Sequence, residues 1–223
     1  VPYDALTPES MIVCDLDGVV YRGPTAVPHA VEALRTSPLP VIYATNNASR
    51  PPADVATHLR ELGLPCDPES VATSSQAGAR LIADRVPPGS SVLALGGPGV
   101  AMALREAGLR AVLPDAVDAH RLVAVLQGYG AQVTASHLAE AAYAVQAGAT
   151  WVATNTDATL PTDRGVAPGN GSLVAAVQRA VGRAPDLVAG KPSPPLYLMS
   201  ADRLAVPADR VLAVGDRLDT DIE

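Results

Sequence analysis

Short apolar runs alternate along this chain with longer segments in which apolar and polar residues are mixed. Each run is four or five residues long, which is typical of the buried strands of a parallel sheet. The expected strands cover 11–14, 41–44, 92–95, 122–126, 151–154 and 211–214. The expected helices cover 30–35, 51–62, 74–84, 97–107, 138–147 and 172–181. This alternation predicts an α/β fold built on doubly wound parallel sheets.

Polar residues follow several of these strands at the point where each strand ends. Asp15 and Asp17 follow the first strand, Thr45 follows the second, and Asp216 follows the last. Lys191 comes shortly after a further apolar segment late in the chain. Open α/β sheets bind ligands outside the carboxyl ends of their parallel strands, so we expect these side chains to form one site.

These residue types suit phosphoryl transfer, which needs a nucleophile, charge neutralisation and a proton source for the leaving group. Asp15 can serve as the nucleophile and form an aspartyl-phosphate. Asp15 and Asp216 are hard oxygen ligands of the kind that Mg²⁺ prefers, and Lys191 would screen the remaining charge. Thr45 would hydrogen-bond the transferring group. Asp17 would first protonate the ester oxygen and then deprotonate the attacking water.

Four short motifs, in chain order, resemble those of the haloacid dehalogenase superfamily. They are Asp15-x-Asp17-Gly18-Val19, Thr45-Asn46-Asn47, Gly190-Lys191-Pro192 and Gly215-Asp216-x-x-x-x-Asp221. Each motif alone is weak, but the ordered set covers nearly the whole chain. The set is similar to the branch of capped phosphatases that acts on glycerol phosphate, phosphoglycolate, pyridoxal phosphate and nucleotides.

The resemblance implies a role for each acidic residue of the motifs. Asp15 is expected to be both the nucleophile and a ligand of Mg²⁺. Asp17 is expected to be the acid and base, with its backbone carbonyl on the metal. Asp216 is expected to be the second carboxylate ligand, and Asp221 to contact the metal site through water.

The resemblance also implies a set of residues that contact the substrate. The expected substrate-binding residues are Gly18, Thr45, Asn46, Asn47, Leu160 and Lys191. Leu160 lies in a segment, 153–161, that resembles the loop of the cap that closes over the active site. Pyridoxal-phosphate phosphatases carry a histidine at this position, so we expect glycerol phosphate or phosphoglycolate as the substrate. Nucleotides and pyridoxal phosphate remain as the alternative.

The same resemblance predicts two domains, one inserted into the other. Residues 1–86 and 186–223 would form the discontinuous catalytic core, and residues 87–185 would form an inserted α/β cap. The family continues beyond Asp221 with a helix and at least one core strand, so we expect a core that is truncated at its C-terminus. Related capped enzymes pair through the cap, so we also expect a homodimer.

Composition narrows the classes of partner. The formal net charge of −7 argues against a surface for nucleic acid. Two cysteines in 223 residues form no pattern for metal or disulfide, which fits a reducing cytoplasm. The sequence shows neither a membrane-spanning apolar stretch nor a signal peptide. We therefore expect a cytoplasmic enzyme whose partner is a small phosphorylated metabolite.

Two alternative functions come from other classes. A phospho-receiver domain also combines aspartates, a threonine and a lysine with Mg²⁺, but it needs only about half this length and places its aspartate after a middle strand. A nucleotide-dependent oxidoreductase is suggested by Gly97-x-Gly99 before a helix and by Asp115 further on. That pattern lacks the third small residue of the dinucleotide fingerprint, so an ordinary strand–helix turn is the preferred interpretation.

Overall fold

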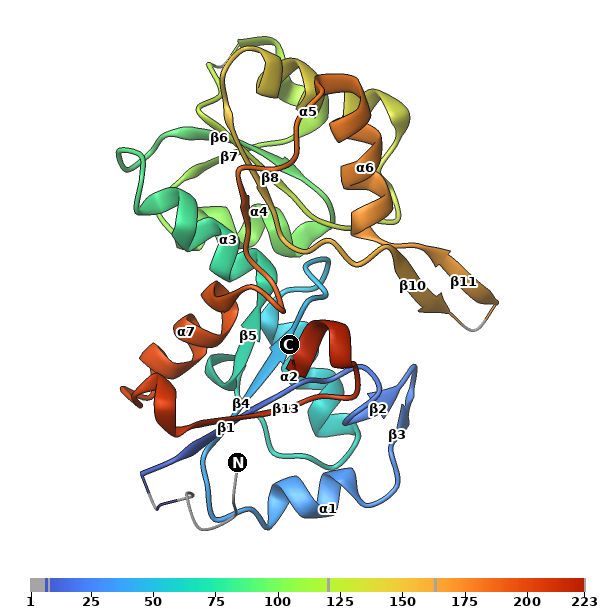
Figure 1. Cartoon of the computed structure of the whole chain (residues 1–223), viewed down its shortest axis with the longest axis vertical. Helices are drawn as coiled ribbons and strands as arrows, with labels where there is room; N and C mark the ends of the chain where they lie inside the picture. Colours follow the sequence, from blue (N-terminus) through green and yellow to red (C-terminus); the bar gives the residue numbers. More distant parts are fainter. Residues whose placement is uncertain (1–6, 8, 120, 163, 223) are drawn as a thin grey trace. The chain divides into compact units, whose positions relative to one another are not determined.

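The computed structural model describes residues 7, 9–119, 121–162 and 164–222 (Figure 1). The chain divides into two compact units. The first unit contains residues up to Thr45, residues 52–72 and residues from Lys191 onward. The second contains residues 46–51 and residues 73–190. One α/β unit is therefore inserted into the sequence of the other.

The first unit is built on a four-stranded sheet of order β13-β1-β4-β5. Its strands are β1 (Met11–Cys14), β4 (Val41–Thr45), β5 (Val71–Thr73) and β13 (Val211–Val214). β1 pairs in parallel with β4 on one side and with β13 on the other. The order places the first strand in the middle of the sheet, so the segments that follow β1, β4 and β13 emerge at one edge.

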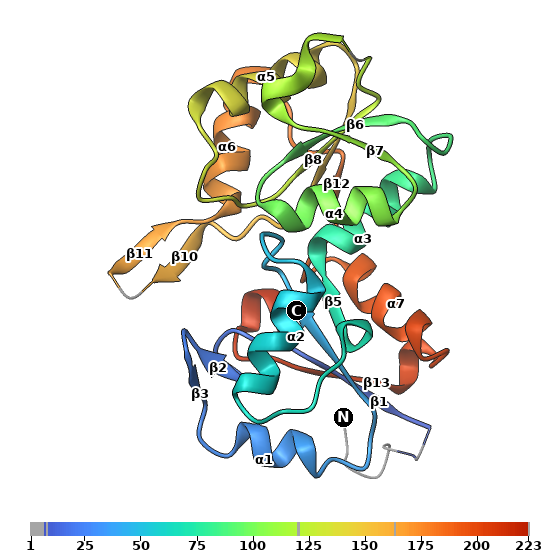
Figure 2. The same cartoon turned by 180° about the vertical axis from the view of Figure 1, so that it is seen from behind.

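Helices pack against this sheet and complete the core of the first unit. They are α1 (Ala30–Arg35), α2 (Pro52–Glu61) and α7 (Pro194–Arg203). The buried face of α2 packs with Cys14 of β1 and Tyr43 of β4 in one apolar cluster. α7 contacts β1 and β4 as well (Figures 1 and 2). A short antiparallel pair, β2 (Tyr21–Arg22) with β3 (Thr25–Ala26), follows the loop after β1.

The second unit has a five-stranded sheet of order β12-β9-β8-β6-β7, in which every pair is parallel. Its strands are β6 (Ser91–Leu95), β7 (Arg110–Val112), β8 (Ala124–Gln127), β9 (Thr150–Ala153) and β12 (Leu187–Val188). The helices are α3 (Ser74–Ala83), α4 (Pro98–Glu106), α5 (Ala135–Gln146) and α6 (Asn170–Val181). α5 and α6 pack around the fully buried Trp151, whereas α3 and α4 pack together (Figure 2).

Several elements of the structure were not predicted from the sequence. They include β5, β7, α7, the two-residue strands β2, β3 and β12, and the antiparallel pair β10 (Thr159–Thr162) and β11 (Gly165–Pro168), which projects from the second unit (Figure 1). The prediction also began α5 three residues late, at 138. The helix begins at Ala135 because Thr134 and His137 form a capping box, in which each side chain bonds the backbone N–H of the other.

The boundaries of the inserted unit differ from the expected 87–185. Residues 46–51, 73–86 and 186–190 group with the inserted unit and not with the core. Packing explains the difference for α3: a Cβ at Gly78 would meet Leu126 of β8 and would lie near Val152 of β9. The helix therefore lies close to the second sheet, and a larger residue at this position would have to displace the Leu126 side chain.

Two further expectations concern the environment of the chain. None of the helices in the described part of the chain has both the length and the apolar character needed to cross a membrane. Cys14 and Cys66 are both buried and free. Burial raises the pKa of the Cys66 thiol to about 11 and that of Cys14 to about 12, which keeps both protonated and unreactive near neutral pH.

Candidate active site

Asp15 lies at the carboxyl end of β1, where the pairing with β13 continues beyond the strand. Cys14 pairs with Val214, and the Asp15 N–H donates to the Val214 carbonyl at 2.8 Å. This hydrogen bond aligns Asp15 with Gly215 and Asp216, the residues that follow β13. The register of two strands thus brings the first and last acidic motifs of the sequence to one edge of the sheet.

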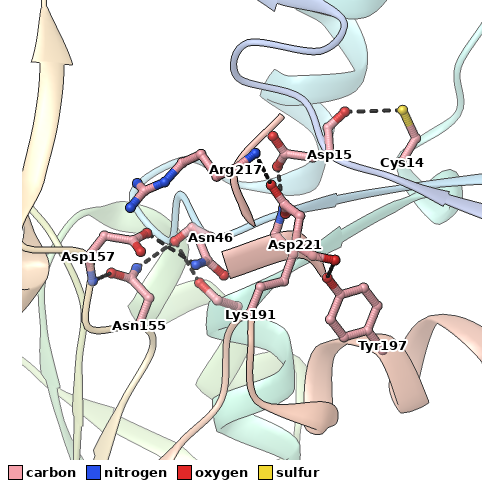
Figure 3. Close-up of polar contacts among 10 residues, drawn as sticks. Cys14, Asp15, Asn46, Asn155, Asp157, Lys191, Tyr197, Arg217 and Asp221 are labelled. Atoms are coloured by element: carbon pink, nitrogen blue, oxygen red, sulfur yellow. Dashed lines mark hydrogen bonds and ion pairs between the residues drawn. The ribbon is translucent and has the colours of Figure 1, made fainter. Parts of the chain in front are cut away.

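Lys191 is the buried cation of this edge. Its side chain is only 4% exposed, and its ammonium donates to Asp15 Oδ1 and, at 2.6 Å, to Asp221 Oδ1 (Figure 3). The Asp221 side chain is 2% exposed and that of Asp15 is 11% exposed. A charge is tolerated at such depth only when it is paired and hydrogen-bonded, and here one lysine serves two carboxylates.

The pKa values of Asp15 and Lys191 show which physical effect dominates at each group. Burial raises the pKa of Asp15 to about 6, although the ammonium of Lys191 opposes the rise. Burial alone would lower the pKa of Lys191, but the two carboxylates outweigh it and raise that pKa above its ordinary value. Lys191 is therefore charged at neutral pH, and Asp15 is ionised above about pH 6.

Three carboxylates converge at the same edge. One oxygen each from Asp15, Asp216 and Asp221 lies within 4.8 Å of the others. Hard carboxylate oxygens at this spacing fit a magnesium ion, which binds through one or two carboxylates and keeps several waters. Asp221 was expected to contact the metal site through water; in the structure its carboxylate belongs to the converging group and also pairs with Lys191.

Two motif glycines make room for these carboxylates. A Cβ at Gly18, whose φ is +96°, would overlap the Asp216 carboxylate. A Cβ at Gly215 would overlap the side chain of Asp221. Glycine is thus required because a carboxylate packs directly against the backbone. The sequence predicted Gly18 as a substrate contact, whereas its structural neighbour is Asp216.

Backbone and phenol groups hold Asp221 in place. The Arg217 N–H donates to Asp221 Oδ2 at 3.2 Å, and the Asp221 N–H donates to the Arg217 carbonyl at 2.9 Å. The Tyr197 hydroxyl of α7 donates to the Asp221 carbonyl at 3.3 Å (Figure 3). Sequence reasoning missed Tyr197, because nothing in the local pattern of α7 marks it.

Asp17 and Thr45 complete the edge of the first sheet. Asp17 is exposed, whereas its neighbour Leu16 is fully buried and anchors the loop. Gly18 N–H donates to the Tyr21 carbonyl at 2.8 Å, which turns this loop back on itself. Thr45 is the last residue of β4 and is 2% exposed. Because β4 is the other neighbour of β1, Thr45 ends its strand at the edge that carries Asp15.

The remaining predicted substrate contacts, Asn46, Asn47 and Leu160, belong to the second unit. Asn47 accepts hydrogen bonds from the backbone N–H and the hydroxyl of Ser49, at 3.1 and 2.6 Å, which is a local turn. Asn46 contacts Asp157 and Asn155 of the same unit. Leu160 is a partly buried residue of β10.

The glycines of the dinucleotide-like pattern have a structural role. Gly97 caps the N-terminus of α4, as an ordinary strand–helix turn requires. A Cβ at Gly97 would meet Ser49, and one at Gly99 would meet the carbonyls of Ala48 and Arg50. Both glycines are therefore required by the close packing of this turn against the chain's own backbone.

Fold and site together define a carboxylate-rich centre at the edge of a parallel α/β sheet, with a second α/β unit inserted. A family model described as haloacid dehalogenase-like hydrolase matches residues 12–110. A second model of HAD-like hydrolases matches residues 188–223. The chain belongs to the haloacid dehalogenase-like hydrolases, which confirms the resemblance of its motifs.

Curated relatives are named as phosphatases. The D-glycerol 3-phosphate phosphatase of Mycobacterium tuberculosis is 46% identical over 214 residues, which cover 95% of this chain and 58% of that enzyme. The chain thus spans less than two thirds of that relative. The acid sugar phosphatase of Staphylococcus aureus is 38% identical over 211 residues, which cover 93% of this chain and 79% of that enzyme.

Two solved structures that resemble this chain are also named as phosphatases. The crystal structure of the glycerol phosphate phosphatase from M. tuberculosis in complex with magnesium has a TM-score of 0.89 and 45% identity, covering 96% of this chain and 64% of that one. The p-nitrophenyl phosphatase from Archaeoglobus fulgidus has a TM-score of 0.86 and 30% identity, covering 96% and 80%.

Proposed function

We propose that this protein is a Mg²⁺-dependent phosphatase that hydrolyses small phosphate monoesters through an aspartyl-phosphate on Asp15. The observation that carries the proposal is the buried ion-paired group of Asp15, Lys191 and Asp221, with Asp216 beside it. A structural ion pair needs one carboxylate per cation. Here Asp15 and Asp221 share one ammonium and the Asp216 carboxylate lies beside them, so a divalent cation would neutralise the added negative charge.

Asp15 is the proposed nucleophile. Its carboxylate attacks the phosphorus atom in line with the leaving oxygen, so the bond to the ester oxygen breaks as the bond to Asp15 forms. Lys191 holds one Asp15 oxygen and directs the other toward the substrate. The same ammonium stabilises negative charge on the transferring phosphoryl group.

Asp17 is the proposed acid and base. It donates a proton to the leaving alkoxide in the first step and then takes a proton from the water that hydrolyses the aspartyl-phosphate. Its exposure suits this role, because the group must exchange protons with substrate and water. The hydroxyl of Thr45 donates a hydrogen bond to the transferring phosphoryl group, and we place Gly18, Asn46, Asn47 and Leu160 among the substrate contacts.

Asp15, Asp216 and the backbone carbonyl of Asp17 are the residues that would hold Mg²⁺, with Asp221 at the same group. When bound, the ion lowers the repulsion between the nucleophile and the phosphate dianion. The magnesium complex of the M. tuberculosis glycerol phosphate phosphatase supports this choice of metal.

Glycerol phosphate or phosphoglycolate is the proposed substrate. The curated names of two relatives, D-glycerol 3-phosphate phosphatase and acid sugar phosphatase, support a small polyol or sugar phosphate. Leu160, where pyridoxal-phosphate phosphatases carry histidine, supports the same choice. Nucleotides and pyridoxal phosphate stay the alternative substrates, and the homodimer through the inserted unit stays a prediction.

The hydrolysis of p-nitrophenyl phosphate by the purified protein tests the activity. We expect turnover with Mg²⁺, loss of turnover with a chelator, and a loss of at least ~1,000-fold in the Asp15→Asn variant. Asp54→Asn, which alters an exposed carboxylate on α2, is the matched control and should keep wild-type turnover. Equal rates in wild type and Asp15→Asn would refute the nucleophile.

A panel of substrates tests the specificity. Glycerol phosphate and phosphoglycolate should give a higher kcat/KM than pyridoxal phosphate and nucleoside monophosphates. A preference for pyridoxal phosphate would contradict the interpretation of Leu160. A phospho-receiver domain would instead retain the phosphoryl group without turnover.

A further inference from the structure

Asn46 directly follows β4, and four of its contacts are with residues of the second unit: Ser74, Asn155, Asp157 and Gly190. Its backbone carbonyl accepts two hydrogen bonds, from the Ser74 hydroxyl at 2.8 Å and from Asn155 Nδ2 at 2.7 Å. These bonds attach the first residue after Thr45 to α3 and to the segment after β9. The backbone at this point is therefore fixed by the inserted unit.

The side chain of Asn46 joins two further segments. Its Nδ2 donates to Asp157 Oδ2 at 3.1 Å (Figure 3). Its Oδ1 packs against the backbone of Gly190, where any Cβ would overlap it. Gly190 directly precedes Lys191, and Asn46 directly follows Thr45. Asn46 thus contacts the residue that precedes Lys191 and is itself the residue that follows Thr45.

Asp157 is itself held firmly. Its N–H donates to Asn155 Oδ1 at 3.1 Å, and its carbonyl accepts from the Gly171 N–H at 2.8 Å. Asn155 is 4% exposed, and its carbonyl accepts from Asn170 Nδ2 at 2.7 Å. Asn170 is the first residue of α6. The backbone that carries the Asp157 carboxylate is thus bonded on both sides, and it is joined to the start of α6 through Asn155.

We propose that Asp157 is a positioning residue for Thr45 and Lys191, which it reaches through the amide of Asn46. This inference rests on the proposed phosphatase function. The bond to Asp157 fixes the orientation of the Asn46 amide, so that Oδ1 faces Gly190 and the peptides on either side keep one geometry. Catalytic groups need placement to within a fraction of an ångström, and such placement comes from the bonds behind them.

Two variants at Asp157 and one control elsewhere in the second unit separate this role from a general structural one. Asp157→Ala removes the acceptor and should lower kcat for p-nitrophenyl phosphate about tenfold, with KM within about twofold; this is the size expected for one hydrogen bond to a charged group. Asp157→Asn keeps an acceptor oxygen and should retain at least about a third of kcat. Glu106→Ala, which removes an exposed carboxylate at the end of α4, is the control and should match wild type.

A double-mutant cycle identifies Asn46 as the intermediary. Asn46→Ala should lower kcat, and adding Asp157→Ala to it should lower kcat no further. Additive losses would overturn the proposal, because Asp157 would then act independently of Asn46. A wild-type kcat in Asp157→Ala, or a rise in KM alone, would overturn it too, because Asp157 would then not position the catalytic groups. Reversing the bond in the double variant Asn46→Asp with Asp157→Asn should recover activity relative to Asn46→Asp.

Amide hydrogen exchange gives a readout that does not depend on turnover. Peptides that contain Thr45 and Lys191 should exchange faster in Asp157→Ala than in wild type or Glu106→Ala. Unchanged exchange at both peptides would refute the inference even if the protein proves to be a phosphatase. An inactive wild type with faster exchange in Asp157→Ala would instead reject the proposed function and keep the positioning contact.

Discussion

The two units use polar groups in opposite ways. At the edge of the first sheet, Lys191 and two buried carboxylates concentrate full charges where water is scarce. In the second unit, Asn46 and Asn155 link backbone and side chains through neutral amides, and the Asp157 carboxylate accepts from one of these amides. A cluster of buried charges costs folding free energy and is kept for chemistry, whereas amide networks fix geometry at little electrostatic cost.

The largest expected effect is the loss of the buried cation. Lys191→Met leaves Asp15 and Asp221 without their partner and should reduce kcat at least ~1,000-fold. Without metal it should also lower the free energy of unfolding by roughly 3 kcal/mol in a denaturant titration. Arg210→Gln, which breaks the exposed pair with Glu9, is the control and should cost less than about 1 kcal/mol. Equal losses of unfolding free energy in the two variants would show that the buried ion pair matters no more than the exposed one.

A smaller effect is expected when a methyl group enters the carboxylate edge. Gly18→Ala displaces the Asp216 carboxylate and should weaken Mg²⁺ binding at least ~tenfold in a calorimetric titration. Gly23→Ala is the matched control, since its φ is also positive, at +58°, but no atom lies within 4 Å of the added carbon. Both variants carry the same kind of backbone strain. Identical metal affinities would show that Asp216 is not a ligand.

The pH dependence of metal binding follows from Asp15. Its pKa in the metal-free protein is raised to about 6 by burial. Protons compete with the metal for the carboxylate, so affinity should be constant above about pH 7 and fall about tenfold by pH 5. Titration of Mg²⁺ binding at these pH values checks the prediction, and the same affinity at both would exclude Asp15 as a ligand.

The smallest effect on activity is expected from the core of the second unit. Trp151 Nε1 donates to Gln127 Oε1 at 2.9 Å, and both side chains are fully buried. Trp151→Phe leaves that oxygen without its donor and should cost about 1–3 kcal/mol of stability. Turnover should change less than about twofold. Adding Gln127→Met should restore part of the stability, and a large loss of turnover in either variant would contradict the separation of roles.

The length and burial of each element explain whether the sequence predicted it. Apolar runs of four or five residues predicted β1, β4, β6, β8, β9 and β13, because a buried strand is apolar along most of its length. The three-residue strands β5 and β7 are too short to form such a pattern, and β10 and β11 are largely exposed. α7 begins at Pro194 and Pro195, after a segment that resembles a loop.

The two polar clusters were also unequally predictable. Charged residues at the ends of apolar strands are costly enough to stand out, so Asp15, Lys191 and Asp216 were found. The bond between Asn46 and Asp157 joins residues 111 positions apart, and no local pattern announces it. Tyr197 was missed for the same reason, since its hydroxyl contacts a backbone carbonyl that any residue would offer.

Trapping the aspartyl-phosphate intermediate tests directly whether Asp15 is the nucleophile. The protein is mixed with p-nitrophenyl phosphate and Mg²⁺, quenched in acid during turnover and digested, and its peptides are weighed by mass spectrometry. We expect one added phosphoryl group on the peptide that contains Asp15, and none in the Asp15→Asn variant. A phosphoryl group on a different residue would contradict this expectation.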